Sequence, residues 1–425
     1  MKSIRFLRTA LIVLLALPLL VSACIKDSCR QLVSFKYRQP VYRTKDEVRA
    51  NIKSNTPRDL KHPGKLYLFG KYIFLNEFDK GIHVIDNSNP ASPRKVAFID
   101  IPGNIDLAAK GNILYADCYT DLVAIDISDA MHARVSNIID YVFPERYYAD
   151  GFVAANGQVI SEWIERDTTI VMDCNSYNVA IRNTDVLQMG PGNFAANGGL
   201  LTATSSQPGI GGSLARFTIV GNHMFSVDHH TLRTISLASP ANPQVTGEIM
   251  AGFDIETIYP FNNRLFLGSM GGLFIYDIGN PNNPVKLGEF SHARACDPVV
   301  ADNDYAYVTL RSGTNCGPTA DEMLVLNVQN LQSPSLVRAY PMTSPQGLSK
   351  DQGKLFVCDG PGGLKYYEAS DPTNLQLLKT ITGLKPVEVI AWNKLAIVVA
   401  DDGLYQFDYS DPANIRQLSK LTITQ

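Results

Sequence analysis

The sequence predicts an all-β fold, a β-propeller of four-stranded antiparallel blades, and three observations lead to that prediction. One strand-and-turn phrase recurs along the chain, successive copies often lie about 40 residues apart, and a second short strand precedes each copy. A repeated β unit of this length cannot bury its own apolar face, so it must stack on copies of itself. Closing the stack into a ring also removes the exposed sheet edges that invite aggregation.

The repeated phrase is a short strand closed by Asp or a similar residue and followed by a turn that contains Pro. Turns of this composition connect strands, because Asp, Asn and Ser side chains bond to the turn backbone and Pro presets its angle. A looser fifth copy lies at 232–243. The four close copies are GIHVIDNSNPASP (81–93), LFIYDIGNPNNP (273–284), LKYYEASDPTN (364–374) and LYQFDYSDPAN (404–414).

The residue that closes each repeated strand serves as an anchor for counting units. Four of the seven gaps between anchors are 40 or 41 residues, the length of one four-stranded blade. Eight anchors predict eight blades, the third degraded and enlarged by an insertion. Seven blades are the alternative, if the units around Asp126 and Asp173 merge into one. The anchors are Asp86, Asp126, Asp173, Ser236, Asp277, Asn327, Glu368 and Asp408.

Alternation and turn residues place the strands within a unit. In one unit, DPVVADN (297–303) is the inner strand, DYAYVTL (304–310) and EMLVLNV (322–328) follow, and PSLVRAYPM (334–342) forms the outer edge. The final unit, 386–425, holds all four of its strands. We therefore expect the ring to close by packing of the first blade against the last, without a strand donated from the N-terminus.

The start of the chain predicts a lipoprotein signal peptide over residues 1–23. Three basic residues precede an apolar run, 10–23, that is short for a membrane span of ~20 residues and is typical of a secretory signal. The run ends in VSAC, which resembles the bacterial lipobox, where Cys24 would be acylated and the chain cleaved before it. The alternative is an ordinary signal peptide followed by a chance cysteine.

This resemblance implies an outer-membrane lipoprotein of a Gram-negative cell envelope, facing either the periplasm or the surface. CIKDS (24–28) also loosely resembles the tag that follows the cysteine in surface-exposed Bacteroidetes lipoproteins. Residues 24–63 are then a lead-in or tether, and 64–425 the propeller. An insertion at about 175–213 is rich in Gly, Asn and Ser, and this composition predicts a loop.

Charge and composition exclude one class of partner. Without residues 1–23, 35 Lys and Arg face 41 Asp and Glu, a formal charge of −6. A mildly acidic chain with no basic stripe lacks the electrostatic footprint of a nucleic-acid-binding protein. The hydrophobic share of 45% argues for a packed core over disorder.

Units such as KGIHVIDNSNPASP, NILYADCYTDLVAIDIS and GGLFIYDIGNPNNP resemble the LVIVD-repeat family of bacterial β-propeller proteins, whose name is this strand motif. By the repeat argument the resemblance covers residues ~64–420. It implies a propeller on an exported, often lipid-anchored protein. It implies no established reaction and transfers no catalytic residues, since a propeller is a scaffold that many functions share.

Polar residues at the starts of the inner strands are the one group of residues in the sequence that suggests a ligand-binding or catalytic site. Such starts converge on one mouth of a propeller channel, where a ring of carboxylates binds a cation such as calcium or supplies two carboxylates for glycosidic chemistry. The alternative is that they are solvated turn residues bonded to backbone. No other cofactor, metal motif or catalytic residue is predicted. The residues are Asp106, Asp150, Glu256 (or Asp254), Asp297, Gln346 and Glu388.

A disulfide between Cys296 and Cys316 is predicted from the hairpin that separates them. Cys296 precedes the inner strand and Cys316 follows the next strand, so both lie at the same end of the blade. Neighbouring strands are ~4.8 Å apart, within reach of a bridge that needs Cα atoms about 4.4–6.8 Å apart. Two unpaired thiols are the alternative. Cys118, Cys174 and Cys358 read as small buried hydrophobes.

Together these features predict a lipid-anchored, non-catalytic binding or scaffold module of the cell envelope. Its partners are the membrane, through the lipid, and a protein or glycan whose identity the sequence does not reveal. The alternative from a different class is a glycan-active hydrolase or lyase with its site at the channel mouth.

Overall fold

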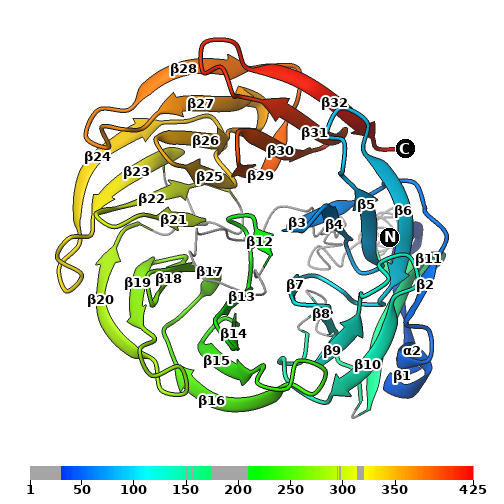
Figure 1. The fold of residues 1–425 in the computed structure, drawn as a ribbon. Helices are drawn as coiled ribbons and strands as arrows, with labels where there is room; N and C mark the ends of the chain where they lie inside the picture. Colours follow the sequence, from blue (N-terminus) through cyan, green and yellow to red (C-terminus); the bar gives the residue numbers. More distant parts are fainter. Residues whose placement is uncertain are drawn as a thin grey trace, which may run out of the picture. The chain divides into compact units, whose positions relative to one another are not determined.

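The computed structural model describes residues 30–146, 148, 152–155, 157–173, 209–293, 295, 298–313 and 320–424. The chain forms two compact units. One comprises Met1–Val41 with Glu162–Gln188, and the other Tyr42–Ser161 with Met189–Gln425. The described part of the larger unit contains seven antiparallel sheets of at least four strands, arranged as a ring of blades (Figure 1).

Each blade begins with its innermost strand, and the next three strands follow outward in chain order. The inner strands are short and largely buried, because they face the centre of the ring. They are β3 (Pro63–Phe69), β7 (Leu107–Lys110), β13 (Phe217–Val220), β17 (Ile255–Phe261), β21 (Val299–Ala301), β25 (Leu348–Asp351) and β29 (Pro386–Trp392).

The second strand of each blade is buried on both faces, since blades pack against blades. All six residues of β8, for example, are buried. Apolar residues therefore occupy consecutive positions instead of alternating with polar ones. These strands are β4 (Tyr72–Glu77), β8 (Ile113–Cys118), β14 (His223–Val227), β18 (Arg264–Ser269), β22 (Tyr305–Leu310), β26 (Lys354–Cys358) and β30 (Leu395–Ala400).

The third strand carries the repeated phrase and ends at the anchor residue. Its side chains pack between neighbouring blades, and the anchor itself reaches the surface at the turn. The third strands are β5 (Gly81–Asp86), β9 (Asp121–Asp126), β15 (Thr231–Ser236), β19 (Gly272–Asp277), β23 (Glu322–Asn327), β27 (Leu364–Glu368) and β31 (Gly403–Asp408).

The fourth strand forms the exposed rim, and its pairing with the third strand shifts register once in every blade. Such a bulge increases the local twist of an edge strand and discourages edge-to-edge pairing. The fourth strands are β6 (Arg94–Asp100), β10 (Arg134–Ile139), β16 (Gln244–Met250), β20 (Val285–Ser291), β24 (Ser335–Pro341), β28 (Gln376–Ile381) and β32 (Arg416–Thr422).

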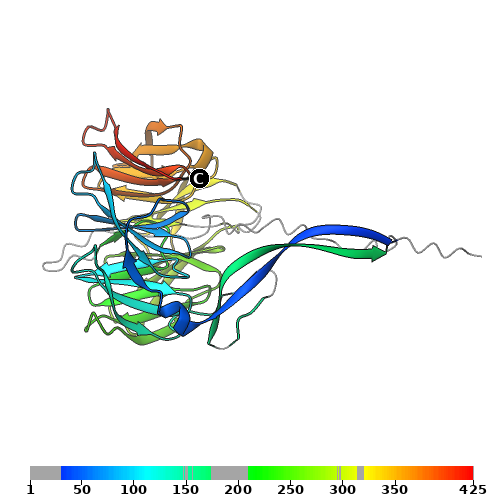
Figure 2. The same cartoon turned by 90° about the vertical axis from the view of Figure 1, so that its right-hand side faces the viewer.

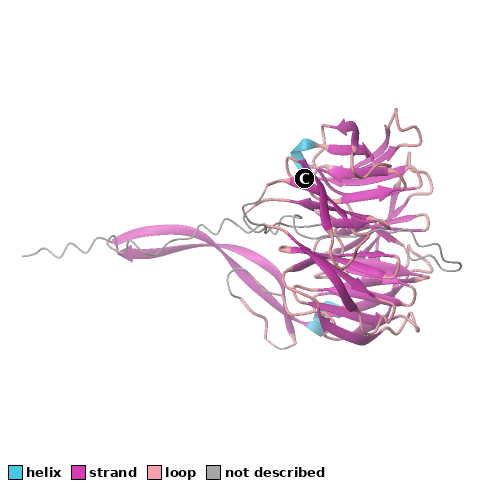
Figure 3. Ribbon diagram, turned by 90° about the vertical axis from the view of Figure 1, so that its left-hand side faces the viewer, coloured by secondary structure: helices cyan, strands magenta, loops and turns pink. Residues whose placement is uncertain are grey.

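Two short strands extend the first blade on both sides. β2 (Lys53–Asn55) pairs with β6 at the rim, and β12 (Ile210–Gly211) pairs with β3 on the inside. Helix is limited to α2 (Lys45–Arg49) and the 3₁₀ turn η1 (Gly360–Gly362) in the described residues (Figure 3). A capping box between Thr44 and Glu47 starts α2.

The prediction of eight blades is wrong, and the alternative of seven is right for a different reason than the merging of two units. Asp126 closes the third strand of a regular four-stranded blade. Asp173 instead ends β11 (Gln158–Asp173), which pairs with β1 (Arg30–Thr44) in a two-stranded sheet outside any blade. Asp173 therefore marks the end of this two-stranded sheet and not an eighth blade.

The seven remaining anchors share one local structure. In each, the side-chain oxygen accepts a hydrogen bond from the backbone N–H two residues later, at 2.8–3.4 Å. The residue directly after each anchor donates its N–H to a carbonyl in the turn between the first and second strands of the same blade. In the first blade, the N–H of Asn87 donates to the carbonyl of Lys71 at 2.8 Å. The repeated Asp/Asn/Ser phrase is therefore turn chemistry that holds each blade together.

Ring closure follows the prediction within the described residues, because β29–β32 form a complete last blade and β3 belongs to the first. Side chains and a single bridge join the two blades. The amides of Asn87 and Gln406 exchange two hydrogen bonds, at 3.0 and 2.7 Å. Ser419 Oγ donates to the carbonyl of Pro90 at 2.7 Å, and Leu60 bridges Ile423 in parallel.

We call β1 paired with β11 the ribbon, and most of its residues belong to the smaller unit. Figure 2 shows its two long strands twisting about each other. No third strand joins this sheet in the described part of the chain. No described helix is long and apolar enough to cross a membrane.

Candidate functional site

Residues 209–217, which we call the central segment, lie inside the ring of blades (Figure 1). Within this segment, β12 runs antiparallel to β3, with Ile210 opposite Leu68 and Gly211 opposite Tyr67. The next residues cross toward the starts of the other inner strands and lead into β13. The centre of the ring is thus occupied by the protein's own backbone.

Two buried carboxyl groups, one on the last blade and one at the start of the second, hold this backbone. Glu388 on β29 accepts hydrogen bonds from the N–H groups of Ser213 and Leu214, both at 3.1 Å. Asp106, directly before β7, accepts from the N–H groups of Arg216 at 2.6 Å and Phe217 at 3.2 Å. A carboxylate that accepts hydrogen bonds from buried backbone N–H groups gives those donors a partner that they would otherwise lack.

Further bonds tie the central segment to other blades. Ser213 Oγ accepts from the N–H of Leu348 on β25 at 2.7 Å, and the carbonyl of Ala215 accepts from the N–H of Ile258 on β17 at 3.0 Å. The N–H of Gly209 donates to the carbonyl of Ala109 on β7 at 3.3 Å. With the pairing to β3 and the bonds to Glu388, the segment contacts five inner strands besides leading into β13.

Glycine is required at two positions of the central segment by close approach. A Cβ on Gly209 would lie 2.1 Å from the Tyr67 ring and 2.5 Å from the carbonyl oxygen of Leu68. A Cβ on Gly212 would lie 2.5 Å from the carboxyl carbon of Glu388. Neither distance is compatible with a side chain at these sites, which explains the glycine content of this part of the insertion.

Lys65 on β3 completes the buried charge at the centre and is only 2% exposed. Burial lowers the pKa of its ammonium group to about 7, although Asp106 and Glu388 oppose the shift. Burial likewise raises the pKa of Glu388 to about 8, against the effect of Lys65, and raises the pKa of Asp106. Asp117, buried nearby, has a pKa raised to about 6 by burial, with Arg146 opposing.

The structure brings together two of the predicted channel-mouth residues, Asp106 and Glu388. Both accept hydrogen bonds from backbone N–H groups and both are buried, whereas the turn alternative had them solvated. Asp150 and Asp297 lie outside the described residues. No group of three or more His, Cys, Asp or Glu in the described ranges could hold a metal ion.

Glu256 and Gln346 serve other contacts. Glu256 lies at the register shift between Ile255 and Thr257 in the pairing of β17 with β18. It lies near Arg311, whose pKa burial lowers while Glu256 and Asp321 oppose the shift. Gln346 uses its backbone: its N–H donates to the carbonyl of Cys358 and its carbonyl accepts from Thr309 Oγ1, both at 2.7 Å.

Sequence reasoning missed Lys65, and it missed the central segment because residues 175–213 were assigned to a loop. One signal was available: Lys65 is a lone charge at the start of an otherwise apolar inner strand, next to predicted acidic strand starts. The position of the segment itself carries no such signal, since glycine-rich sequence is equally typical of loops.

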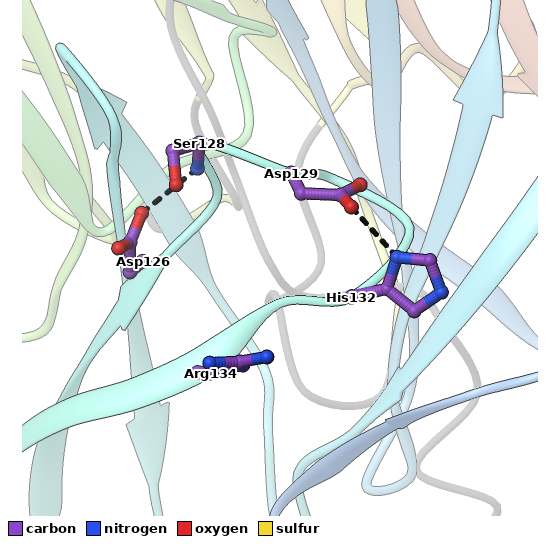
Figure 4. Close-up of a pocket in the computed structure, with 5 residues that line it drawn as sticks. All are labelled: Asp126, Ser128, Asp129, His132 and Arg134. Atoms are coloured by element: carbon purple, nitrogen blue, oxygen red, sulfur yellow. Dashed lines mark hydrogen bonds and ion pairs between the residues drawn. The ribbon is translucent and has the colours of Figure 1, made fainter.

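A hollow of about 310 Å³ lies against the turn between β9 and β10 (Figure 4). Four of its five lining residues bond to one another within the turn. Asp126 accepts from the N–H of Ser128 at 2.8 Å, and Asp129 pairs with His132 at 2.7 Å. Because the same turn recurs in other blades, we assign this hollow to the repeat and not to a ligand site.

Only two of the cysteines with a prediction lie in the described residues. Cys118 and Cys358 are free and buried, as predicted. Cys24, Cys174 and the predicted pair Cys296 and Cys316 lie outside the described residues.

The fold defines the class of this protein: a seven-bladed β-propeller built from an internal repeat. Residues 64–98 and 104–137 match the LVIVD repeat, which places this motif in the first two blades. No curated protein matches the chain.

Solved structures resemble the chain in fold. A protein from Lactobacillus plantarum aligns with 85% of this chain and 97% of its own, at 11% identity and a TM-score of 0.53. PorZ, an essential bacterial surface component of the type-IX secretion system of Porphyromonas gingivalis, aligns with 86% of this chain at 13% identity and a TM-score of 0.47. The alignment spans 39% of PorZ. At such identities the likeness shows the fold alone.

Proposed function

We propose that this protein is a lipid-anchored module of the cell envelope that binds a partner protein without catalysing a reaction. The observation that carries the proposal is the ribbon, a two-stranded sheet with no third strand in the described residues. A two-stranded ribbon is at best marginally stable in water, and exposed strand edges readily pair with another chain. A partner strand added to an edge would supply the missing hydrogen bonds.

The side chains of the ribbon support a protein partner. Leu32 is 71% exposed and Val171 61%, and Tyr37, Ile164 and Ile170 are exposed as well. Charge differs between the two edges: β1 carries four basic and no acidic residues, whereas β11 carries four acidic and one basic. We therefore expect an acidic extended segment to pair along β1.

A photo-cross-linking experiment tests the ribbon as the binding surface. A photoreactive phenylalanine analogue replaces Tyr37, and a control protein carries it at Leu336, which is 51% exposed on the rim strand β24. Illumination of intact envelopes is expected to give a discrete adduct from the Tyr37 position only. No adduct from Tyr37, or the same adduct from both positions, would contradict the proposal.

The anchoring part of the proposal rests on Cys24 at the end of VSAC. We expect the mature protein to begin at Cys24 and to sediment with outer membranes, because more than one acyl chain is needed for stable anchoring and a lipidated cysteine carries two or three. Cys24→Ala should release the protein or leave an uncleaved precursor. Unchanged size and unchanged membrane fractionation of this variant would rule out lipidation.

A further inference from the structure

We propose that the centre of the ring is a peptide-binding site, which the central segment occupies in cis and which an extended Gly-x-x-Gly segment of a partner protein can occupy in its place. The site consists of the inner edge of β3 with the carboxylates of Asp106 and Glu388. The inference does not rest on the ribbon or on the lipid anchor.

The occupant is held chiefly through its backbone. The N–H groups of Gly212, Ser213 and Leu214 donate to Leu66 and Glu388, and those of Arg216 and Phe217 donate to Asp106. Backbone recognition of this kind is the mode by which a peptide adds a strand to an exposed sheet edge. It does not require the peptide to come from the same chain.

The ring selects its occupant sterically at two points. Gly209 and Gly212 approach Tyr67 and Glu388 too closely for any Cβ, and they are three residues apart. The Ser213 side chain adds two hydrogen bonds: its Oγ accepts from the N–H of Leu348 at 2.7 Å and donates to Glu388 at 3.4 Å. The chemistry that fits is thus an extended segment with glycine at positions i and i+3 and serine at i+4.

Because the central segment competes with a free peptide for the site, the affinity for the peptide depends on how tightly the central segment is held. A tethered occupant acts at an effective concentration of the order of mM, so a free peptide competes poorly unless the cis occupant is weakened. Gly209→Ala with Gly212→Ala weakens the occupant without altering β3, Asp106 or Glu388. Gly271→Ala is the matched control, because a Cβ there meets nothing within 4 Å.

The probe is a fluorescein-labelled peptide of residues 208–217, PGIGGSLARF, measured by fluorescence polarisation with the full chain. We expect the double variant to bind it at least ~10-fold more tightly than the wild type and the Gly271→Ala control, by the effective-concentration argument. The same peptide with both glycines changed to alanine should not compete. A folded double variant that binds no better than wild type, or equal binding of both peptides, would overturn the proposal.

Hydrogen exchange on the wild-type protein gives a test that does not depend on folding of the variant. Millimolar unlabelled peptide is expected to speed exchange of the Ser213, Leu214, Arg216 and Phe217 amides, because the displaced segment loses its carboxylate acceptors. The alanine-substituted peptide should have no effect. Unchanged exchange with the glycine peptide at saturation would show that the segment is a permanent part of the ring.

Discussion

Glu388→Ala is expected to lower the free energy of unfolding by about 3–5 kcal/mol, because each buried donor left without an acceptor costs roughly 1–3 kcal/mol and three backbone donors lose theirs. The N–H groups of Ser213, Leu214 and Val389 all donate to this carboxylate. Each would lose its acceptor in a region where Glu388 is fully buried. Lys65 would also lose one of the three carboxyl groups that oppose the effect of burial on its pKa. Urea unfolding measures the change.

The matched control for this effect is Glu289→Gln on the rim strand β20, whose partner Lys286 is 42% exposed. Exposed ion pairs contribute little, so this variant should unfold like the wild type. A Glu388→Ala protein as stable as the control would show that the central segment does not depend on Glu388.

The isosteric variant Glu388→Gln adds a pH readout. The raised pKa of Glu388, about 8 against 4.5 in an unfolded chain, means that the folded protein holds an extra proton between these values. The free energy of unfolding contributed by this group therefore falls as the pH rises through that window. Glutamine cannot titrate, so this part of the pH dependence should disappear from the variant.

Asp121→Ala is expected to lower the free energy of unfolding by about 3–5 kcal/mol, the range seen when one partner of a buried ion pair is removed. Asp121 is 1% exposed and forms ion pairs with Lys45 and Arg49 of α2, the latter at 2.7 Å. Its removal leaves the ammonium of Lys45, itself 9% exposed, without its buried counter-charge. We expect α2 to detach from the second blade, seen as faster amide exchange in residues 45–52 together with lower stability.

Asp140→Ala is the control for this prediction, because Asp140 pairs with the same two cations but is 58% exposed. Solvent screens such a pair, so the loss should be below about 1 kcal/mol. Equal effects of the two substitutions would mean that burial of Asp121 is not what holds α2.

These contacts change how the centre of the ring is understood. Asp106 and Glu388 were candidates for cation binding or glycosidic chemistry, yet both are bonded to backbone N–H groups of the central segment. In this arrangement they are positioned to recognise polypeptide backbone. A glycan-array screen of Asp106→Asn and Glu388→Gln would reveal any carbohydrate binding that depends on them.

The blade repeat was predictable from sequence because its chemistry is local. Seven anchors, from Asp86 to Asp408, each bond to the backbone two residues ahead. A pattern of that range is fully contained in a short stretch of chain. The strands of the unit at 297–342 were placed correctly for the same reason, as β21–β24.

The eighth anchor failed because strand pairing is not a local property. Asp173 ends a strand with the expected composition, but that strand pairs with β1 at the other end of the sequence. Composition predicts that a strand forms, and only the folded chain decides which neighbour it meets.

The sequence by itself determined that polar residues stand at the starts of the inner strands. The ring brings the starts of these strands together at its centre, and Asp106 and Glu388 both bind the central segment there. The sequence could not determine what they bind. The central segment comes from an insertion with no repeat, and its place inside the ring depends on bonds to five inner strands that are distant in sequence. Those bonds require the folded ring, because only the tertiary structure brings the donors and carboxyl groups of distant blades within hydrogen-bonding distance.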